Sequence, residues 1–242
     1  MSTSVRRVVI TGASRGIGLE LTRQHLEAGD QVVATCRTPA KASALHALAA
    51  AHAARCTVVE LDVGEEDSIA RAARQVGERF EGVELVWSNA GVYPGSPGTP
   101  VREAPLGQLH AADGLEVLRV NAVGAILVAQ AFLPLLRAGR SPKLAALSSG
   151  YGSVSDNHGT PYWYGASKAA LNMLHRSLAF DGAARGVTVA LLSPGWTQTD
   201  MGGPRAPDPL PDVVTGLRRV VERLRPDETG GFFDWRGRAL PW

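Results

Sequence analysis

The stretch Val8-Val9-Ile10-Thr11-Gly12-Ala13-Ser14-Arg15-Gly16-Ile17-Gly18-Leu19-Glu20-Leu21 decides the fold, because its glycine-rich turn joins two elements of different period. Val8–Ile10 is a short apolar run of the kind that forms a buried strand. From Leu19 to Leu26 the apolar side chains recur at helical spacing. The stretch therefore predicts a strand, a tight turn and a helix in immediate succession.

The glycine turn suits the binding of a phosphate group. Glycine lets the backbone come close to a ligand, and a helix N-terminus offers unpaired N–H groups and a positive dipole end. The spacing Gly12-x-x-x-Gly16-x-Gly18 has one residue more in its first gap than the common dinucleotide fingerprint. Because the turn stands at the first strand–helix junction of an alternating pattern, it predicts a dinucleotide site rather than a merely structural turn.

The alternation of strand and helix continues along the chain. Strands are expected at about 6–11, 31–36, 56–61, 84–88, 143–148 and 187–192, with a short one around Phe232-Phe233. Helices are expected at about 16–28, 39–53, 66–80, 113–138, 162–184 and 210–224. Such alternation implies right-handed crossovers and a parallel sheet. We expect a doubly wound α/β fold, a Rossmann fold, with about seven strands and helices on both faces in three layers.

Length and composition favour one domain over residues 1–242. The chain is 45% hydrophobic, which suffices for one sizeable core. The net charge of +2 comes with scattered basic residues, so nucleic acid is not expected as a partner. Cys36 and Cys56 lie in or beside predicted strands without metal-ligand spacing, which favours reduced, packed thiols and no metal site.

The hydropathy pattern also bears on membrane association. No apolar run approaches the roughly 20 residues that a spanning helix needs. The N-terminus enters a strand without a secretory apolar region. The sequence therefore predicts no membrane span and, by default, a cytoplasmic location.

Further motifs follow the later strands. They are Asn89-Ala90-Gly91 after the fourth, Ser148-Ser149 after the fifth, Pro194-Gly195 after the sixth, Asn121 in the long helix, and Tyr164-Gly165-Ala166-Ser167-Lys168. In this order and spacing, over essentially the whole chain, the sequence resembles the short-chain dehydrogenase/reductase family. Within the family it resembles the single-domain carbonyl reductases of the C-factor and sniffer type. That finer resemblance rests on 34–37, 164–173, 194–203 and the closing Trp242.

The resemblance implies a proton-transfer site. Carbonyl reduction by a nicotinamide hydride creates alkoxide character on oxygen, which requires a proton donor within hydrogen-bond reach. Tyr164 is that donor by resemblance, and Lys168, one helical turn further, is expected to lower the phenol pKa from about 10. Ser149 is expected to polarise the carbonyl and Asn121 to hold a water in a proton relay. Singly, such residues are more often structural, but their joint order favours the catalytic interpretation.

Charge at the end of the second strand favours NADPH over NADH. A site specific for NAD places a carboxylate there, but this chain has Cys36 followed by Arg37. Arg37 and Arg15 suit a 2′-phosphate, the alternative being that both are solvated surface charges. The expected cofactor contacts are Gly12, Ser14, Arg15, Gly16, Ile17, Gly18, Arg37, Asp62, Val63, Asn89, Ala90, Gly91, Tyr164, Lys168, Pro194, Gly195, Thr197 and Thr199.

Three loops, at about 93–105, 151–163 and 202–211, are expected to form the substrate site. The last is expected to act as a lid, with a rigid surface connection as the alternative. The prediction is an NADPH-dependent oxidoreductase acting on a small carbonyl or alcohol, with Tyr164 as general acid or base. A 3-ketoacyl-thioester reductase and a dinucleotide-binding regulatory protein are the alternatives. Since family members pair through helices near 113–138 and 162–184, the resemblance also implies a homodimer or homotetramer.

Overall fold

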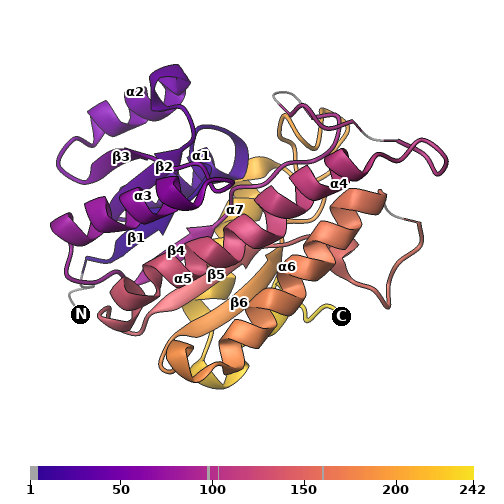
Figure 1. The fold of residues 1–242 in the computed structure, drawn as a ribbon. Helices are drawn as coiled ribbons and strands as arrows, with labels where there is room; N and C mark the ends of the chain where they lie inside the picture. The colour runs from indigo at the N-terminus through magenta and orange to yellow at the C-terminus, as the bar shows by residue number, and fades with distance from the viewer. Residues whose placement is uncertain (1–4, 97–98, 103, 160) are drawn as a thin grey trace.

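The computed structural model describes residues 5–96, 99–102, 104–159 and 161–242. Within these residues, one parallel sheet has the strand order β3-β2-β1-β4-β5-β6-β7 (Figure 1). The order runs outward in both directions from β1 and β4, which creates a topological switch point between them. The strands are β1 (Arg7–Ile10), β2 (Gln31–Cys36), β3 (Cys56–Glu60), β4 (Leu85–Ser88), β5 (Lys143–Leu147), β6 (Thr188–Ser193) and β7 (Gly231–Asp234).

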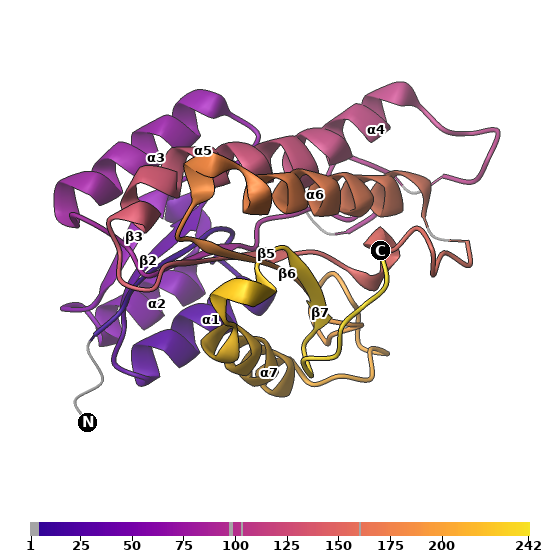
Figure 2. The same ribbon diagram turned by 90° about the horizontal axis from the view of Figure 1, so that it is seen from below.

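Helices cover both faces of this sheet, as Figure 2 shows. On one face lie α3 (Glu66–Arg79), α4 (Ala111–Leu118), α5 (Gly124–Arg137) and α6 (Tyr162–Phe180). On the other lie α1 (Gly16–Glu27), α2 (Ser43–Ala51) and α7 (Leu210–Arg223). Each layer has its own apolar core, and the predicted doubly wound, three-layer fold is confirmed.

The two cores follow from the alternation of side chains along the strands. In β1, Val9 packs toward Phe132 and its neighbours on the α3–α5 side, whereas Val8 and Ile10 join the cluster under α1 and α7. Because both faces of the sheet are covered, its strands are continuous apolar runs, and their predicted bounds differ from the observed ones by at most one residue at nearly every end.

The helix predictions need three corrections. The long helix predicted at 113–138 is interrupted by a π-helical turn, η2 (Arg119–Val123), between α4 and α5. The helix predicted at 39–53 opens as the 3₁₀ turn η1 (Pro39–Lys41) before α2 begins. The helix predicted at 162–184 ends at Phe180 and is followed by the 3₁₀ turn η4 (Gly182–Ala184). Apolar spacing continues across all three interruptions, so periodicity alone does not reveal them.

The expectation that no run reaches membrane-spanning length was wrong. The helical run Ala111–Arg137 is long and apolar enough to cross a membrane by length and composition, with half of its most apolar window buried inside the protein. Val128, Phe132 and Leu136 of this run are fully buried in the core between α3 and the sheet. The core helix of an α/β fold passes the same length test, and this run has that position.

Candidate active site

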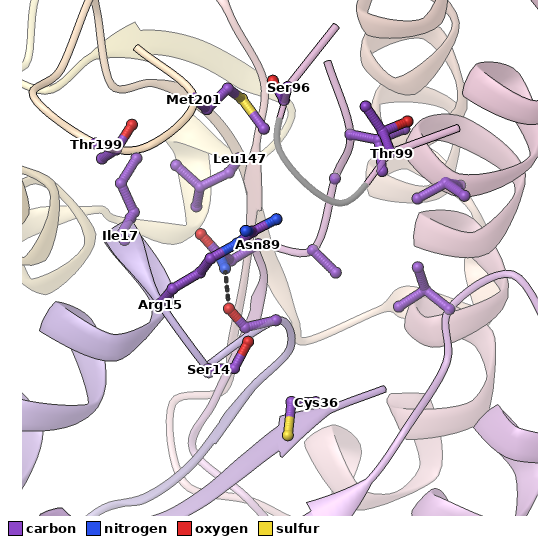
Figure 3. A pocket seen from close by; sticks show the side chains of 18 of the residues that line it. Ser14, Arg15, Ile17, Cys36, Asn89, Ser96, Thr99, Leu147, Thr199 and Met201 are labelled. Carbon is purple, nitrogen blue, oxygen red and sulfur yellow. Dashed lines mark hydrogen bonds between the residues drawn. The ribbon is translucent and has the colours of Figure 1, made fainter. Parts of the chain in front are cut away.

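A cavity opens at the carboxyl ends of the strands, at the switch point between β1 and β4 (Figure 3). Its wall combines the glycine turn at one end with the Tyr164–Lys168 pair at the other. It is lined by Gly12, Ser14, Arg15, Gly16, Ile17, Gly18, Cys36, Arg37, Leu61, Asp62, Val63, Asn89, Ala90, Gly91, Val92, Ser96, Thr99, Val120, Leu147, Ser148, Tyr164, Lys168, Pro194, Thr199, Asp200 and Met201.

The glycine turn is built for close approach of its own backbone segments. Gly12 and Gly16 have φ angles of +68° and +53°, in the left-handed region that favours glycine. A Cβ at Gly18 would collide with the carbonyl oxygen of Gly12, so α1 begins directly against the turn. The Asn89 side chain donates from Nδ2 to the Gly12 oxygen at 3.2 Å, the bond drawn in Figure 3. The ends of β1 and β4 are thereby held together beneath the cavity.

The far end of the cavity lies beyond the ends of β2 and β3. Cys36 is buried at the end of β2, and Arg37 beside it is exposed while still lining the cavity. Asp62, after β3, accepts a hydrogen bond from Gly64 N at 2.9 Å, which fixes the turn that leads into α3. Arg15 lies 3.9 Å from Asp200 across the cavity mouth. The side chains at the end of β2 are therefore a thiol and a guanidinium, as the sequence indicated.

Tyr164 and Lys168 project from the first turns of α6 into the opposite end of the cavity. Lys168 Nζ donates to the Leu147 carbonyl oxygen at 2.7 Å and lies 5.7 Å from the centre of the Tyr164 ring. The Tyr93 ring packs against Tyr164 at a centroid distance of 4.8 Å. Ser149 is not among the described residues that line the cavity, but its side chain lies close enough to Tyr164 to lower the phenol pKa.

Burial dominates the protonation of this pair. Desolvation raises the pKa of Tyr164 to about 12, against a lowering by the hydrogen bond with Ser149. Desolvation also lowers the pKa of Lys168 to about 8. The Lys168 ammonium binds the Leu147 carbonyl and is itself desolvated, and burial is the largest cause acting on Tyr164, so the expected lowering of the phenol pKa by Lys168 stays a prediction. At neutral pH the phenol keeps its proton.

Asn121 lies in the π-helical turn and is completely buried. Its Oδ1 accepts from Val92 N at 2.7 Å, and its Nδ2 donates to Val92 O at 2.8 Å and to Ser167 Oγ at 3.0 Å. A Cβ at Gly91 would lie 3.2 Å from Asn121 Oδ1 and 3.7 Å from Lys168 Nζ. The amide thus ties the segment after β4 to α6, immediately behind the cavity wall.

Ser148 has a different environment from Ser149. It is buried, and its Oγ donates to Asn172 Oδ1 on α6 at 2.6 Å. Ser149 is half-buried, and its Oγ accepts from Tyr151 N at 3.2 Å. Ser148 therefore anchors the end of β5, and Ser149 is the serine whose hydroxyl approaches Tyr164.

Two expected cofactor contacts lie off the cavity wall. Thr197 is buried, and its hydroxyl donates to Pro194 O at 2.9 Å, which turns it away from the cavity. Gly195 faces Asp208 and Trp235 instead. Sequence reasoning singled out the remaining expected cofactor positions but not these lining residues: Leu61, Val92, Ser96, Thr99, Val120, Leu147, Asp200 and Met201. Most of them directly precede or follow a motif at a strand end, and this adjacency could have predicted that they line the cavity.

The lid at 202–211 stays a prediction, and the cavity-lining residues of this segment lie just before it. The segment after β6 forms a compact loop closed at its neck, where Gln198 N donates to Asp208 O at 3.0 Å and Asp208 N to Trp196 O at 3.4 Å. The residues from this loop that line the cavity are Thr199, Asp200 and Met201, and α7 already begins at residue 210.

The loop predicted at 151–163 overlaps α6, which begins at Tyr162, the predicted start of that helix. Tyr162–Phe180 is helical, and Trp163 turns inward, where a Cβ at Gly114 of α4 would lie 2.7 Å from its ring. The rest of the segment and residues of α6 form a second cavity. Its lining residues are Tyr151, Ser153, Val154, Asn157, Gly159, Tyr162, Gly165, Ala166 and Ala169.

Comparison with known proteins agrees with this architecture. The family model for short chain dehydrogenases matches residues 6–209. The C-signal protein of Myxococcus xanthus is 45% identical over 138 residues, which cover 57% of this chain and 83% of that protein. The structure of an NADPH-bound carbonyl reductase from chicken fatty liver superposes with a TM-score of 0.89 at 34% identity, covering 98% of this chain and 99% of that one.

A second solved structure gives the same result. The carbonyl reductase Sniffer of Drosophila melanogaster has a TM-score of 0.90 at 30% identity, covering 98% of this chain and all of the other. The similarity therefore extends over nearly the whole chain. With the motif order, the topology and these matches in agreement, the chain belongs to the short-chain dehydrogenase/reductase family of oxidoreductases.

Proposed function

We propose that the protein is an NADPH-dependent reductase that transfers hydride between nicotinamide and a small carbonyl or alcohol substrate, with Tyr164 as the general acid or base. The observation that carries this proposal is one continuous cavity that joins the glycine turn to a protonated phenol. A dinucleotide-binding protein without chemistry does not need a proton donor at the end of its cleft.

The residues present fit a dinucleotide. The N-terminus of α1 faces the cavity through Gly16, Ile17 and Gly18, where unpaired backbone N–H groups and the helix dipole favour a pyrophosphate. Asp62 and Val63 line the wall after β3, in position for an adenosine. Pro194 and Thr199, from the segment after β6, also line the cavity, with the Thr199 side chain beside Gly16, and we assign them to the nicotinamide end. When bound, the dinucleotide supplies or accepts the hydride.

The preference for NADPH is argued from charge. No carboxylate stands at the end of β2, where Cys36 and Arg37 line the cavity. Arg15 lines it from the glycine turn. Guanidinium groups bind a phosphate through charge-assisted, often bidentate hydrogen bonds, whereas a ribose hydroxyl offers them much less. The chicken carbonyl reductase that this chain resembles is described as NADPH-bound, which supports the same cofactor here.

The protein's own groups move the proton. Tyr164 holds its proton at neutral pH, since a phenol has a pKa of about 10 and burial raises it further to about 12, and the protonated form is the one that reduction requires. Ser149, whose side chain lowers the pKa of the neighbouring Tyr164 phenol, would donate to a carbonyl oxygen at the same point. Lys168 is mostly an ammonium at neutral pH, with a pKa of about 8, and stabilises negative charge that develops nearby.

We assign Asn121 to positioning. Its amide is committed to Val92 and to Ser167. Through these bonds Asn121 fixes the cavity wall at Gly91 and the position of α6 relative to it. It thereby sets where Tyr164 and Lys168 of α6 lie in the cofactor cleft. This differs from the water-holding role that the family resemblance implies.

The test is the steady-state oxidation of NADPH and of NADH by purified protein across aldehydes, ketones, diketones and ketoacyl thioesters. We expect turnover of free carbonyl compounds with NADPH, at a higher kcat/KM than with NADH. Turnover of thioesters alone would replace the proposal by the ketoacyl reductase. Saturable NADPH binding without turnover of any substrate would favour a regulatory protein.

A further inference from the structure

The Trp242 side chain packs in a defined site on the surface beside α6. The guanidinium carbon of Arg176 lies 4.4 Å from the centre of its ring, and the ring of Phe232 lies 5.5 Å away at an interplanar angle of 36°. Phe232 belongs to β7 and is buried among Leu171 and Leu191. Trp242 is 37% exposed, and the covered part of its ring packs against side chains from α6 and β7.

The chain reaches this site by folding back along β7. Leu240 N donates to Phe232 O at 2.9 Å, and Phe233 and Ala239 form an antiparallel bridge. Asp234 N donates to Arg238 O at 2.9 Å, which closes the turn between the two passes. The return segment is therefore fixed to the sheet, and Trp242 is held in a defined place.

From that place Trp242 holds the loop that follows β5. Its main-chain oxygen accepts two hydrogen bonds from Ser155, from the backbone N at 2.8 Å and from Oγ at 2.6 Å. The neighbouring Ser153 Oγ accepts from Asp156 N at 3.1 Å and lies 3.5 Å from Ser155 Oγ. Near its start the same loop is tied to α6, where Asn172 Nδ2 donates to Gly152 O at 3.2 Å.

The loop is thus anchored at Gly152 and at Ser155, and the part of it between β5 and Ser155 contains the side chains nearest to Tyr164. Tyr151 meets the Tyr164 ring edge-on at 6.3 Å, and its backbone N donates to the Ser149 hydroxyl. Ser153 and Val154 form part of the wall of the second cavity, which Tyr151 also lines. Tyr151 and Val154 are exposed at 48% and 73%, so packing alone restrains them weakly.

We propose that Trp242 is a positioning residue for carbonyl substrates: through Ser155 it holds the segment from Ser149 to Val154, and so sets where Tyr151 stands beside Tyr164. This inference rests on the proposed function. A second consequence is that the segment from Phe232 to Trp242, distant in sequence from every catalytic motif, contributes to substrate selectivity.

The test compares Trp242→Ala with Phe180→Ala. Phe180 is the other aromatic ring under the Arg176 guanidinium, at 5.8 Å, and it is exposed and has no contact with the loop among the described interactions. Trp242→Ala keeps the main-chain oxygen that accepts from Ser155 but removes the ring that Arg176 and Phe232 hold in place. We expect the KM of the carbonyl substrate to rise at least about fivefold, the scale of one lost cation–π contact, with the KM of NADPH unchanged. Trp242→Phe should recover most of the loss, and Phe180→Ala should match the unaltered protein.

A second measurement does not depend on turnover. Amide hydrogen exchange of residues 152–156 should be faster in Trp242→Ala, and to a lesser degree in Ser155→Ala, than in Phe180→Ala. Unchanged exchange would overturn the proposal, as would faster exchange with an unchanged carbonyl KM in an active enzyme. Faster exchange in a protein that reduces no carbonyl would leave the hold of Trp242 on the loop supported and would instead overturn the proposed function.

Discussion

At the scale of single residues, burial separates the roles of Tyr164 and Lys168. The same desolvation acts on an acid and on a base, raising the pKa of the phenol to about 12 and lowering that of the ammonium to about 8. The phenol therefore stays protonated at neutral pH but is a weaker acid than a free phenol, and the lysine titrates close to neutral pH. The i, i+4 spacing could be seen in the sequence, but the degree of burial could not, because Leu147, Tyr93 and Tyr151 come from other elements.

Cofactor preference is also decided by single residues. Arg37→Ala removes one guanidinium from the end of β2, and we expect the KM of NADPH to rise about tenfold, with the KM of NADH nearly unchanged. Steady-state kinetics with both nucleotides measures this, and Arg74→Ala, on the exposed side of α3, is the matched control. An equal rise for both nucleotides would show that Arg37 does not distinguish the phosphate.

At the scale of elements, the π-helical turn between α4 and α5 sets the geometry of the site. The turn brings Asn121 to face Val92 and Ser167, while Gly124 just after it leaves no room for a Cβ against the Val63 carbonyl. π-Helical turns are frequent at functional sites. Asn121 could be predicted as a site residue by resemblance, but its element was predicted as one long helix, because apolar spacing runs on through the turn.

Replacing Asn121 tests this element directly. Asn121→Ala leaves the Val92 N–H and carbonyl without their partner, and we expect the free energy of unfolding to fall by about 2–3 kcal/mol. NADPH affinity should weaken too, since Gly91 and Val92 line the cavity. Urea unfolding and a binding titration measure the two effects, with Gln130→Ala on the exposed side of α5 as control. Loss of turnover at unchanged stability and affinity would contradict a positioning role.

Loops were less predictable than strands for a physical reason. Buried parallel strands are continuous apolar runs, so their ends can be found locally. The neck of the loop at Trp196 and Asp208, and the contact of Trp242 with Ser155, depend on chain segments that meet only after folding. Trp163 shows the same limit: its packing against Gly114 of α4 has no local signature.

At the scale of the whole molecule, the fold places ionisable groups in both helical layers. His175 on α6 is completely buried, with Nδ1 3.1 Å from the Leu171 carbonyl oxygen. His25 on α1 lies between Asp30, 2.7 Å from its Nδ1, and the Trp87 indole, which donates to its Nε2 at 2.9 Å. Burial lowers the pKa of both imidazoles. The packing of both helical layers is therefore stable only while His25 and His175 are uncharged.

Acid should destabilise the fold through His175. Burial lowers its pKa from 6.5 to about 4, so the unfolded chain binds more protons between these values. The stabilisation is full above pH 6.5 and is lost as the pH falls toward 4, by about 3 kcal/mol. Thermal unfolding of His175→Leu should show a flatter dependence over this range than the unaltered protein and than His110→Leu, which alters an exposed histidine. Equal slopes in all three would contradict this assignment.

The most direct measurement for the whole account is the reduction of the best carbonyl substrate by Tyr164→Phe, with NADPH affinity determined in parallel. The variant keeps the ring that packs against Tyr93 and lacks only the hydroxyl. We predict that kcat falls at least about a hundredfold while the Kd of NADPH changes little, because general acid catalysis is lost and the cofactor wall is kept. Retention of full turnover by Tyr164→Phe would show that the proton comes from elsewhere and would contradict the proposed mechanism.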